Sequence, residues 1–135
     1  MERRYINPLE LSVPKTYTHV VVTSAGRTVH VSGQVPRDGA GLVIGKGDLR
    51  AQAVQVFENL KAALAAADAG FADLVKINTY VVDLTPEKAQ ILRDVRAEYF
   101  AGRHPPASTM VGVASLVHPD FLLEIEAVAT VSDRR

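Results

Sequence analysis

Two carboxylates near the C-terminal end alternate with large apolar residues and are candidates for acid–base chemistry. In Leu123-Glu124-Ile125-Glu126 the repeat of two is that of a β-strand, whose successive side chains point to opposite faces. Glu124 and Glu126 therefore share one face, and we expect the apolar face to belong to the core. A carboxylate in a partly desolvated cleft can accept a proton from water or orient it for attack. The alternative is that both glutamates lie on a solvated strand face.

Hydroxyl side chains elsewhere in the chain could hold a small ligand. Ser108 and Thr109 follow the prolines of segment 105–106, and each hydroxyl can donate or accept a hydrogen bond. Tyr17 stands at the junction between a loop and a strand, where a phenol can close a pocket. The alternative for Tyr17 is a half-buried residue that only packs.

Other kinds of site are excluded by their missing motifs. The four histidines do not have the spacing of metal ligands, so we predict no metal and no other cofactor. Segment 41–47 (GLVIGKG) is not a phosphate-binding loop, because Ala40 replaces the first glycine and Gly47 replaces the required Ser or Thr. The chain has no cysteine and no Gly-x-Ser-x-Gly motif, which argues against covalent acyl chemistry.

The composition is that of one globular domain spanning residues 1–135. Its 15 basic residues balance 15 acidic ones, and they are not clustered with aromatic residues, so we expect no nucleic-acid partner. No apolar run approaches the length of a membrane span, and the N-terminal decapeptide lacks the apolar core of a signal peptide. The absence of cysteine fits a reducing compartment, and we expect a cytoplasmic protein without a membrane partner.

The elements that must position these residues alternate between strands and helices. β-branched runs predict strands at 4–6, 20–23, 28–32 and 74–84, followed by two more strands in 105–127. The second and third runs flank the turn 24–27, which predicts a hairpin-like pair. Asp48 can cap a long helix that stops at Gly70, and Thr85 can cap a second helix that begins at Pro86 and ends near Gly102.

The order βββαβαββ predicts an α+β fold with a mixed sheet. A strand–helix–strand passage implies a parallel crossover, and two helices can cover only one face of the sheet. Yet several strands are apolar on both faces, as in 20–22 and 77–82. We therefore expect a homo-oligomer in which subunits bury the uncovered face against one another.

The C-terminal third resembles the signature of the RidA/YjgF family of enamine/imine deaminases. The matching residues are Pro106, Ala107, Thr109, Val111, Ala114, Leu116, Leu123, Glu124, Ile125 and Glu126. The resemblance extends from Tyr17 through the turn at 32–34 to Glu126 and covers nearly the whole chain. It implies a chorismate-mutase-like fold with a mixed six-stranded sheet, two helices on one face, and a homotrimer with a small-molecule cleft at each subunit junction.

The resemblance also assigns roles to residues. It implies that Glu124 positions the hydrolytic water, whereas Glu126 is structural. It places further residues at the cleft, namely Tyr17, Ser32, Gly33, Tyr80, Thr109 and Met110. The alternatives are that Ser32 and Gly33 only form a turn that needs a glycine and that Tyr80 only packs in the sheet. The position where the family carries an arginine that grips the substrate carboxylate is occupied by Ser108, which has no charge. Arg93, on the second predicted helix, is a candidate for a replacement charge, or else a solvated helix residue.

These expectations lead to one hypothesis and one alternative. The hypothesis is a trimer of the arginine-lacking kind that binds a small carbonyl- or imine-bearing metabolite and, if catalytic, adds water to a C=N bond with release of ammonia. The alternative is a non-catalytic ligand-binding or interaction protein on the same scaffold, since a fold alone does not determine function.

Overall fold

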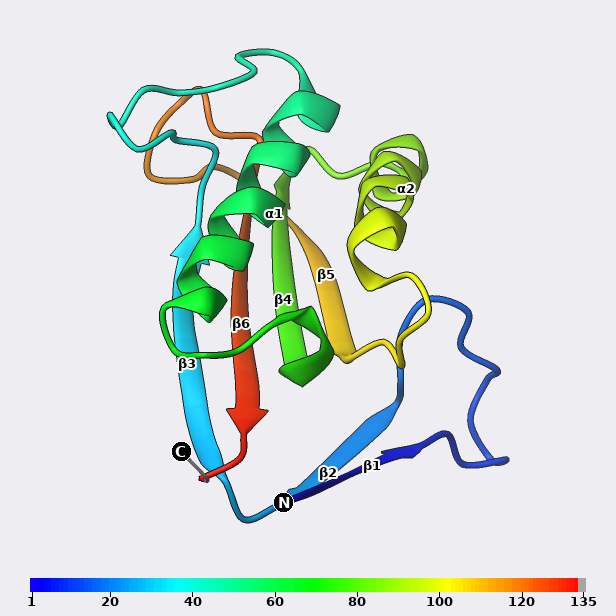
Figure 1. Cartoon of the computed structure of the whole chain (residues 1–135). Helices are drawn as coiled ribbons and strands as arrows, with labels where there is room; N and C mark the ends of the chain where they lie inside the picture. Colours follow the sequence, from blue (N-terminus) through cyan, green and yellow to red (C-terminus); the bar gives the residue numbers. More distant parts are fainter. Residues whose placement is uncertain (134–135) are drawn as a thin grey trace.

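The computed structural model describes residues 1–133 and shows the predicted order of strands and helices (Figure 1). The elements are β1 (Glu2–Ile6), β2 (Val20–Ser24), β3 (Arg27–Gln34), α1 (Leu49–Ala65), the short 3₁₀ helix η1 (Phe71–Asp73), β4 (Leu74–Val82), α2 (Pro86–Phe100), β5 (Ala107–Val113) and β6 (Leu123–Val131). The α+β class and the order βββαβαββ are thereby confirmed.

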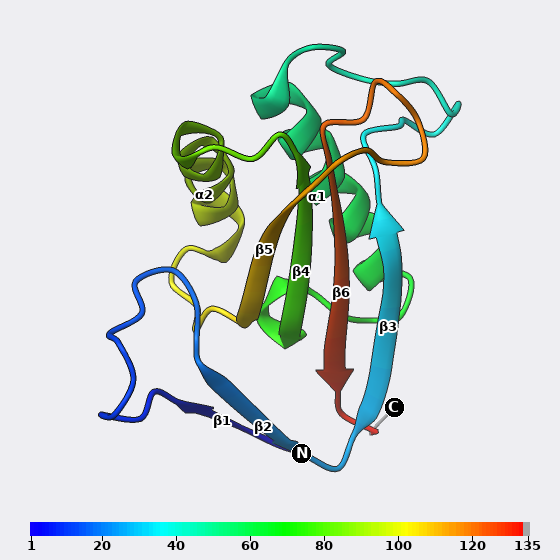
Figure 2. The ribbon, with the colours of Figure 1, turned by 180° about the vertical axis from the view of Figure 1, so that it is seen from behind.

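The strands form two sheets rather than one continuous six-stranded sheet. The main sheet has the order β3-β6-β4-β5, in which β4 and β5 run parallel and the other neighbours antiparallel. α2 connects the parallel pair as the expected crossover. β1 and β2 form a separate antiparallel ribbon that diverges from the main sheet (Figure 2).

The predicted pairing of β2 with β3 is wrong. The turn at Ala25 and Gly26 has positive φ angles of 56° and 90°, but β2 pairs with β1 and β3 pairs with β6. Arg3 of β1 donates hydrogen bonds to Thr130 and forms an ion pair with Asp73 at 2.7 Å, which ties the ribbon to the end of the main sheet. The partners of each strand thus depend on contacts far along the chain, which turn residues do not specify.

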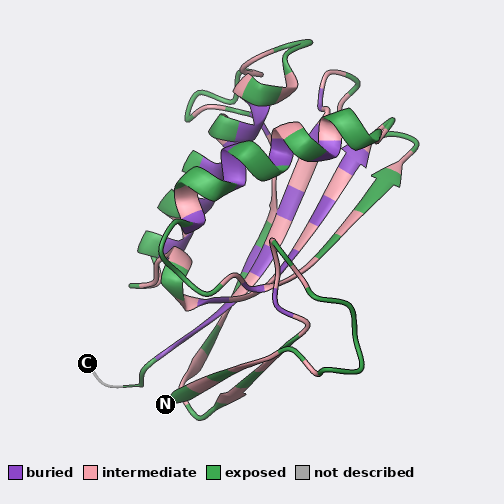
Figure 3. Ribbon diagram, turned by 90° about the vertical axis from the view of Figure 1, so that its right-hand side faces the viewer, coloured by how far each residue is buried: buried purple, intermediate pink, exposed green. Residues whose placement is uncertain are grey.

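Both helices cover the same face of the main sheet, as expected, and the core lies between them and the sheet (Figure 3). The largest fully buried side chains are Phe57, Phe121, Leu60, Leu64, Leu74, Ile77, Leu123 and Ile125. The opposite face is open and carries the side chains that alternate with this core. Within residues 1–133, no helix combines the length and apolarity needed to cross a membrane.

The predicted helix caps are confirmed, but α1 ends earlier than expected. The side chains of Asp48 and Thr85 accept hydrogen bonds from the amides of Ala51 and Lys88, respectively. α1 ends at Ala65, before the expected stop at Gly70, and Asp68 takes the left-handed conformation (φ 57°). Aspartate tolerates this conformation better than most residues, so the chain turns before it reaches the glycine.

Candidate functional site

Glu124 and Glu126 lie next to each other on the open face of β6 but in different surroundings. The Oε2 atom of Glu126 accepts hydrogen bonds from Asn78 Nδ2 (2.9 Å) and Tyr80 Oη (2.7 Å), and these bonds lower the pKa of Glu126. Glu124 stands opposite Tyr80 in the strand register, yet within residues 1–133 its carboxylate accepts no hydrogen bond. Glu126 is therefore held by its neighbours, whereas Glu124 is available to a water molecule or a ligand.

The carboxylate of Glu124 rests directly on the backbone of Gly33. A Cβ atom added at Gly33 would lie 1.8 Å from Glu124 Oε2 and 2.6 Å from its Cδ. Gly33 lies where the pairing of β3 with β6 shifts register, between Val31 and Gln34. The glycine is thus required here by a close approach, which places the Glu124 side chain beside the β3 backbone.

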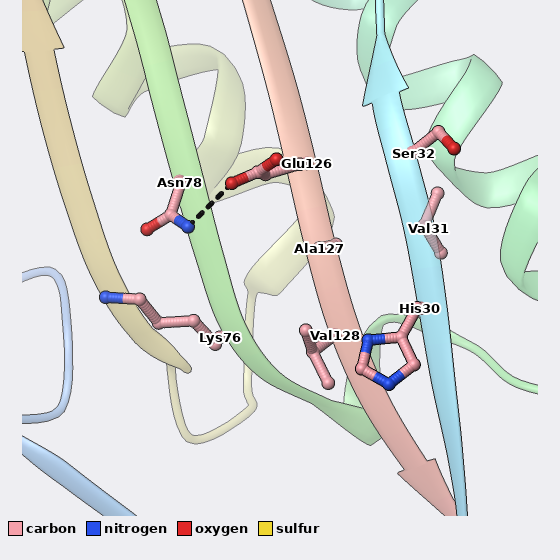
Figure 4. A pocket seen from close by; sticks show the side chains of 8 residues that line it. All are labelled: His30, Val31, Ser32, Lys76, Asn78, Glu126, Ala127 and Val128. Carbon is pink, nitrogen blue, oxygen red and sulfur yellow. Dashed lines mark hydrogen bonds between the residues drawn. The ribbon is translucent and has the colours of Figure 1, made fainter.

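A polar hollow of about 300 Å³ lies on the same open face, between β3, β6 and β4 (Figure 4). Its lining includes His30, Ser32, Lys76, Asn78 and Glu126. Thr109, on the neighbouring β5, is exposed and accepts a hydrogen bond from Lys76 Nζ at 2.9 Å. The open face therefore gathers Ser32, Gly33, Tyr80, Thr109 and Glu124 from the predicted site.

Ser108 and Met110 lie on the opposite side of the sheet, toward the helices. In the parallel pairing with β4 they stand beside Ile77 and Thr79, which are both buried on the helix side. Met110 packs against the hydrophobic core, and the Ser108 hydroxyl accepts a hydrogen bond from Arg96 Nη1 at 3.1 Å. Strand alternation therefore separates Ser108 and Met110 from Thr109.

Arg96 of α2 is a buried residue that our sequence analysis did not select. Only 7% of its surface is exposed, and Nη2 donates to the backbone carbonyl of Thr16 at 3.1 Å. Burial, together with the nearby charge of Arg93, lowers the pKa of Arg96. A signal was present, because Arg96 follows Leu92 by four positions in the buried stripe of the helix.

Tyr17 and Arg93 lie beside this region and line a further pocket of about 460 Å³. Tyr17 is half-buried, with its ring edge-on to His19 at 5.2 Å between centroids, and Arg93 is exposed. The predicted site residues thus fall into an open-face group around Glu124 and a group around Ser108, α2 and Tyr17. One chain does not bring the two groups together, because they lie on opposite faces of the sheet.

In the part of the chain that the structure describes, no group of three His, Asp or Glu side chains is arranged to hold a metal ion.

Comparison with known proteins identifies a family model, a solved structure and curated relatives that this chain resembles. The family model described as endoribonuclease L-PSP matches residues 9–131. The crystal structure of YyfB from Yersinia pestis, described as a conserved Rid family protein of unknown function, superposes with a TM-score of 0.89 at 39% identity and covers 97% of this chain and 100% of that one. Protein DfrA of Myxococcus xanthus is 38% identical over 84% of this chain and 83% of its own length. The 2-iminobutanoate/2-iminopropanoate deaminase of Dermatophagoides farinae is 34% identical over 78% of this chain and 80% of its own.

Proposed function

Because this chain belongs to the endoribonuclease L-PSP family, also called RidA/YjgF, we propose that it binds a small imine or carbonyl metabolite and hydrolyses C=N bonds with release of ammonia. The observation that carries the proposal is the contrast between the two glutamates. Glu126 is occupied by Asn78 and Tyr80, whereas Glu124 accepts no hydrogen bond within residues 1–133 and faces the open side. The deaminase from Dermatophagoides farinae supports the same chemistry for a relative.

The proposed reaction needs only one base and one water molecule. Glu124 accepts a proton from water as the water oxygen bonds to the imine carbon and the C=N electron pair moves to nitrogen. The protonated carboxyl then returns the proton to the amine nitrogen of the tetrahedral intermediate. Glu124 next accepts the proton of the new hydroxyl group and passes it to the amine nitrogen. The C–N bond breaks as the carbonyl forms, and ammonia leaves, so that imine and water become carbonyl compound and ammonia. No other reactant is consumed.

We propose that the complete site forms between subunits of a homotrimer. Glu124 lies on β6, which is separated from the edge strand β5 by β4, a distance of roughly 10 Å at ordinary strand spacing. Since Ser108 lies on the other face of β5, a ligand that uses both groups must receive one of them from a neighbouring chain. The exposed Val111 beside Tyr80 supplies apolar surface for such a contact. Light scattering at three times the monomer mass is the expected result, and a monomer would contradict the shared cleft.

We propose a cytoplasmic protein without nucleic-acid or membrane partners. The balanced charge of 15 basic and 15 acidic residues supports this proposal, as does the absence of cysteine.

The proposal is tested by ammonia release from freshly generated 2-iminopropanoate. Glu124→Gln keeps the shape of the side chain but removes the base, and we expect turnover to fall by about a hundredfold or more. Glu87→Gln, an exposed position at the start of α2, is the matched control and should retain the wild-type rate. Equal rates for wild type and Glu124→Gln would contradict the role of Glu124.

A second candidate function is favoured by Ser108, which cannot supply the charge that the family arginine provides. Under this alternative the chain binds its ligand without hydrolysing it. Wild-type protein would then bind a 2-oxo acid but release ammonia no faster than buffer.

A further inference from the structure

A pocket beside α2 collects positive charge without any acidic residue. It has a volume of about 220 Å³ and lies between α2 and the segments before β2 and β5. Lys15, Arg93, Arg96 and Arg103 line it, together with apolar atoms of Phe100 and others. Four of the chain's 15 basic residues thus meet at one pocket, although the sequence scatters them and the net charge is zero.

Arg96 is the residue that makes this pocket unusual. Its side chain is more than nine-tenths buried, yet within residues 1–133 it has no carboxylate partner at salt-bridge distance. Its two hydrogen bonds go to neutral acceptors, the Ser108 hydroxyl and the Thr16 carbonyl. A buried charge is costly unless it is paired, so an unpaired guanidinium next to a second arginine calls for an anion.

We propose that this pocket binds the carboxylate of a small 2-oxo or 2-imino acid, with Arg96 as the principal binding residue and Arg93 as its partner. The bonds to Ser108 and Thr16 fix the plane of the guanidinium and leave further N–H donors for a bidentate contact. The apolar atoms of Phe100 and Pro105 suit a short alkyl chain. Arg96, delivered from α2, would thereby supply the charge that Ser108 lacks.

This inference deepens the proposed function and depends on it only for the identity of the acid. Carboxylate binding at Arg96 can exist whether or not the bound molecule is hydrolysed. The tests are therefore separable: removing the carboxylate contact changes binding, whereas removing Glu124 changes turnover.

The experiment measures binding of pyruvate to the full chain by titration calorimetry, with the neutral methyl ester of pyruvate as the comparison. Wild type is expected to bind pyruvate at least tenfold more tightly than the ester. Arg96→Met removes a charge-assisted hydrogen-bond donor at similar volume and should weaken pyruvate binding about tenfold to a hundredfold, with little effect on the ester. Arg96→Lys keeps the charge but not the fork, and an intermediate affinity is expected.

Arg93→Gln provides a second variant whose folding is not in question, because Arg93 is exposed. It should weaken pyruvate binding by a smaller factor of about two to ten. Glu124→Gln should bind pyruvate like wild type even where it has lost turnover. If neither wild type nor any variant releases ammonia, but pyruvate binding still depends on Arg96, the deaminase proposal is refuted and the carboxylate pocket is supported.

Three results would overturn the inference. The first is equal binding of pyruvate and its ester by wild type. The second is unchanged pyruvate binding in Arg96→Met and Arg93→Gln, which would make Arg96 a structural tie between α2, Thr16 and β5. The third is tighter binding of inorganic phosphate than of pyruvate, which would replace the carboxylate with a different anion.

Discussion

Replacing Gly33 by alanine should disable the proposed site while leaving the fold intact. The added Cβ would lie 1.8 Å from Glu124 Oε2, whereas ordinary contacts begin near 3.4 Å, so the carboxylate must move by about 1.6 Å. The atom in the way is the end of a flexible side chain on an open face, and it can move by changing rotamer. The φ angle of Gly33 is not in the left-handed region, so alanine adds no backbone strain.

Gly33→Ala should change the free energy of unfolding little but the rate of ammonia release strongly. A displaced or off-rotamer side chain costs about 0.5–1.5 kcal/mol, and alanine regains about 0.4–1 kcal/mol by restricting the unfolded chain. The free energy of unfolding should therefore change by less than about 1 kcal/mol. A misplacement of about 1 Å can cost a hundredfold in rate, and we expect ammonia release from 2-iminopropanoate to fall by roughly that factor.

The assay combines urea unfolding with ammonia release and includes two further variants. Gly39→Ala is the matched control, because a Cβ there meets no atom within 4 Å and the rate should remain that of wild type. In the double variant Gly33→Ala with Glu124→Gln, the two losses should not add, since both act through the same carboxylate. A fully active Gly33→Ala protein, or strictly additive losses in the double variant, would show that Gly33 does not act through the Glu124 carboxylate.

Three further predictions concern pH and buried hydrogen bonds. Hydrogen bonding lowers the pKa of Glu126 below its usual 4.5. The stability that this carboxylate contributes is therefore present above that pH and is lost as the pH falls through the lower pKa of the folded state. In thermal unfolding, the melting temperature should fall less between about pH 6 and about pH 3 in Glu126→Gln than in wild type. Burial, aided by the hydrogen bond to Glu58, raises the pKa of Tyr99 from 10.0 to about 12. The folded protein should therefore lose stability as the pH rises from 10.0 toward that value, and Tyr99→Phe should lose less. Phenolate absorbance measures the pKa, and unfolding curves at each pH measure the stability. Gln52 is fully buried and bonds to the carbonyls of two residues and to the Leu122 amide, so Gln52→Leu should lower the free energy of urea unfolding by about 2–4 kcal/mol. The control Gln55→Leu, on the same helix but more exposed, should cost less than about 1 kcal/mol, and a similar loss in both would contradict the assigned role of Gln52.

Local signals predicted the elements of this fold, and distant contacts decided their arrangement. Asp48 and Thr85 cap their helices through bonds that reach only three residues along the chain, so the sequence is sufficient to predict them. Arg3 of β1 donates hydrogen bonds to Asp73 and Thr130, which lie 70 and 127 positions along the chain, and no turn motif encodes the pairing of β2 with β1. The α2 crossover between parallel strands is a general rule of topology and was predicted correctly.

The same distinction applies to the candidate site. The repeat of two placed Glu124 and Glu126 on one face, but only the register with Asn78 and Tyr80 shows which carboxylate is occupied. That repeat also separates Ser108 from Thr109, a consequence that the family resemblance obscured. The position of Arg96 four residues after Leu92 indicated burial, but its hydrogen bonds to Ser108 and Thr16 come from segments that the helical repeat does not specify.

The most direct test of the account is the rate of ammonia release from freshly generated 2-iminopropanoate by wild-type protein, measured against buffer and beside Ser108→Arg. We expect wild type already to exceed the buffer rate, because Glu124 positions the water and Arg96 supplies the charge that Ser108 lacks. Activity in Ser108→Arg alone would contradict it: the scaffold and Glu124 would then be competent, but the natural chain would serve a ligand other than a 2-imino acid.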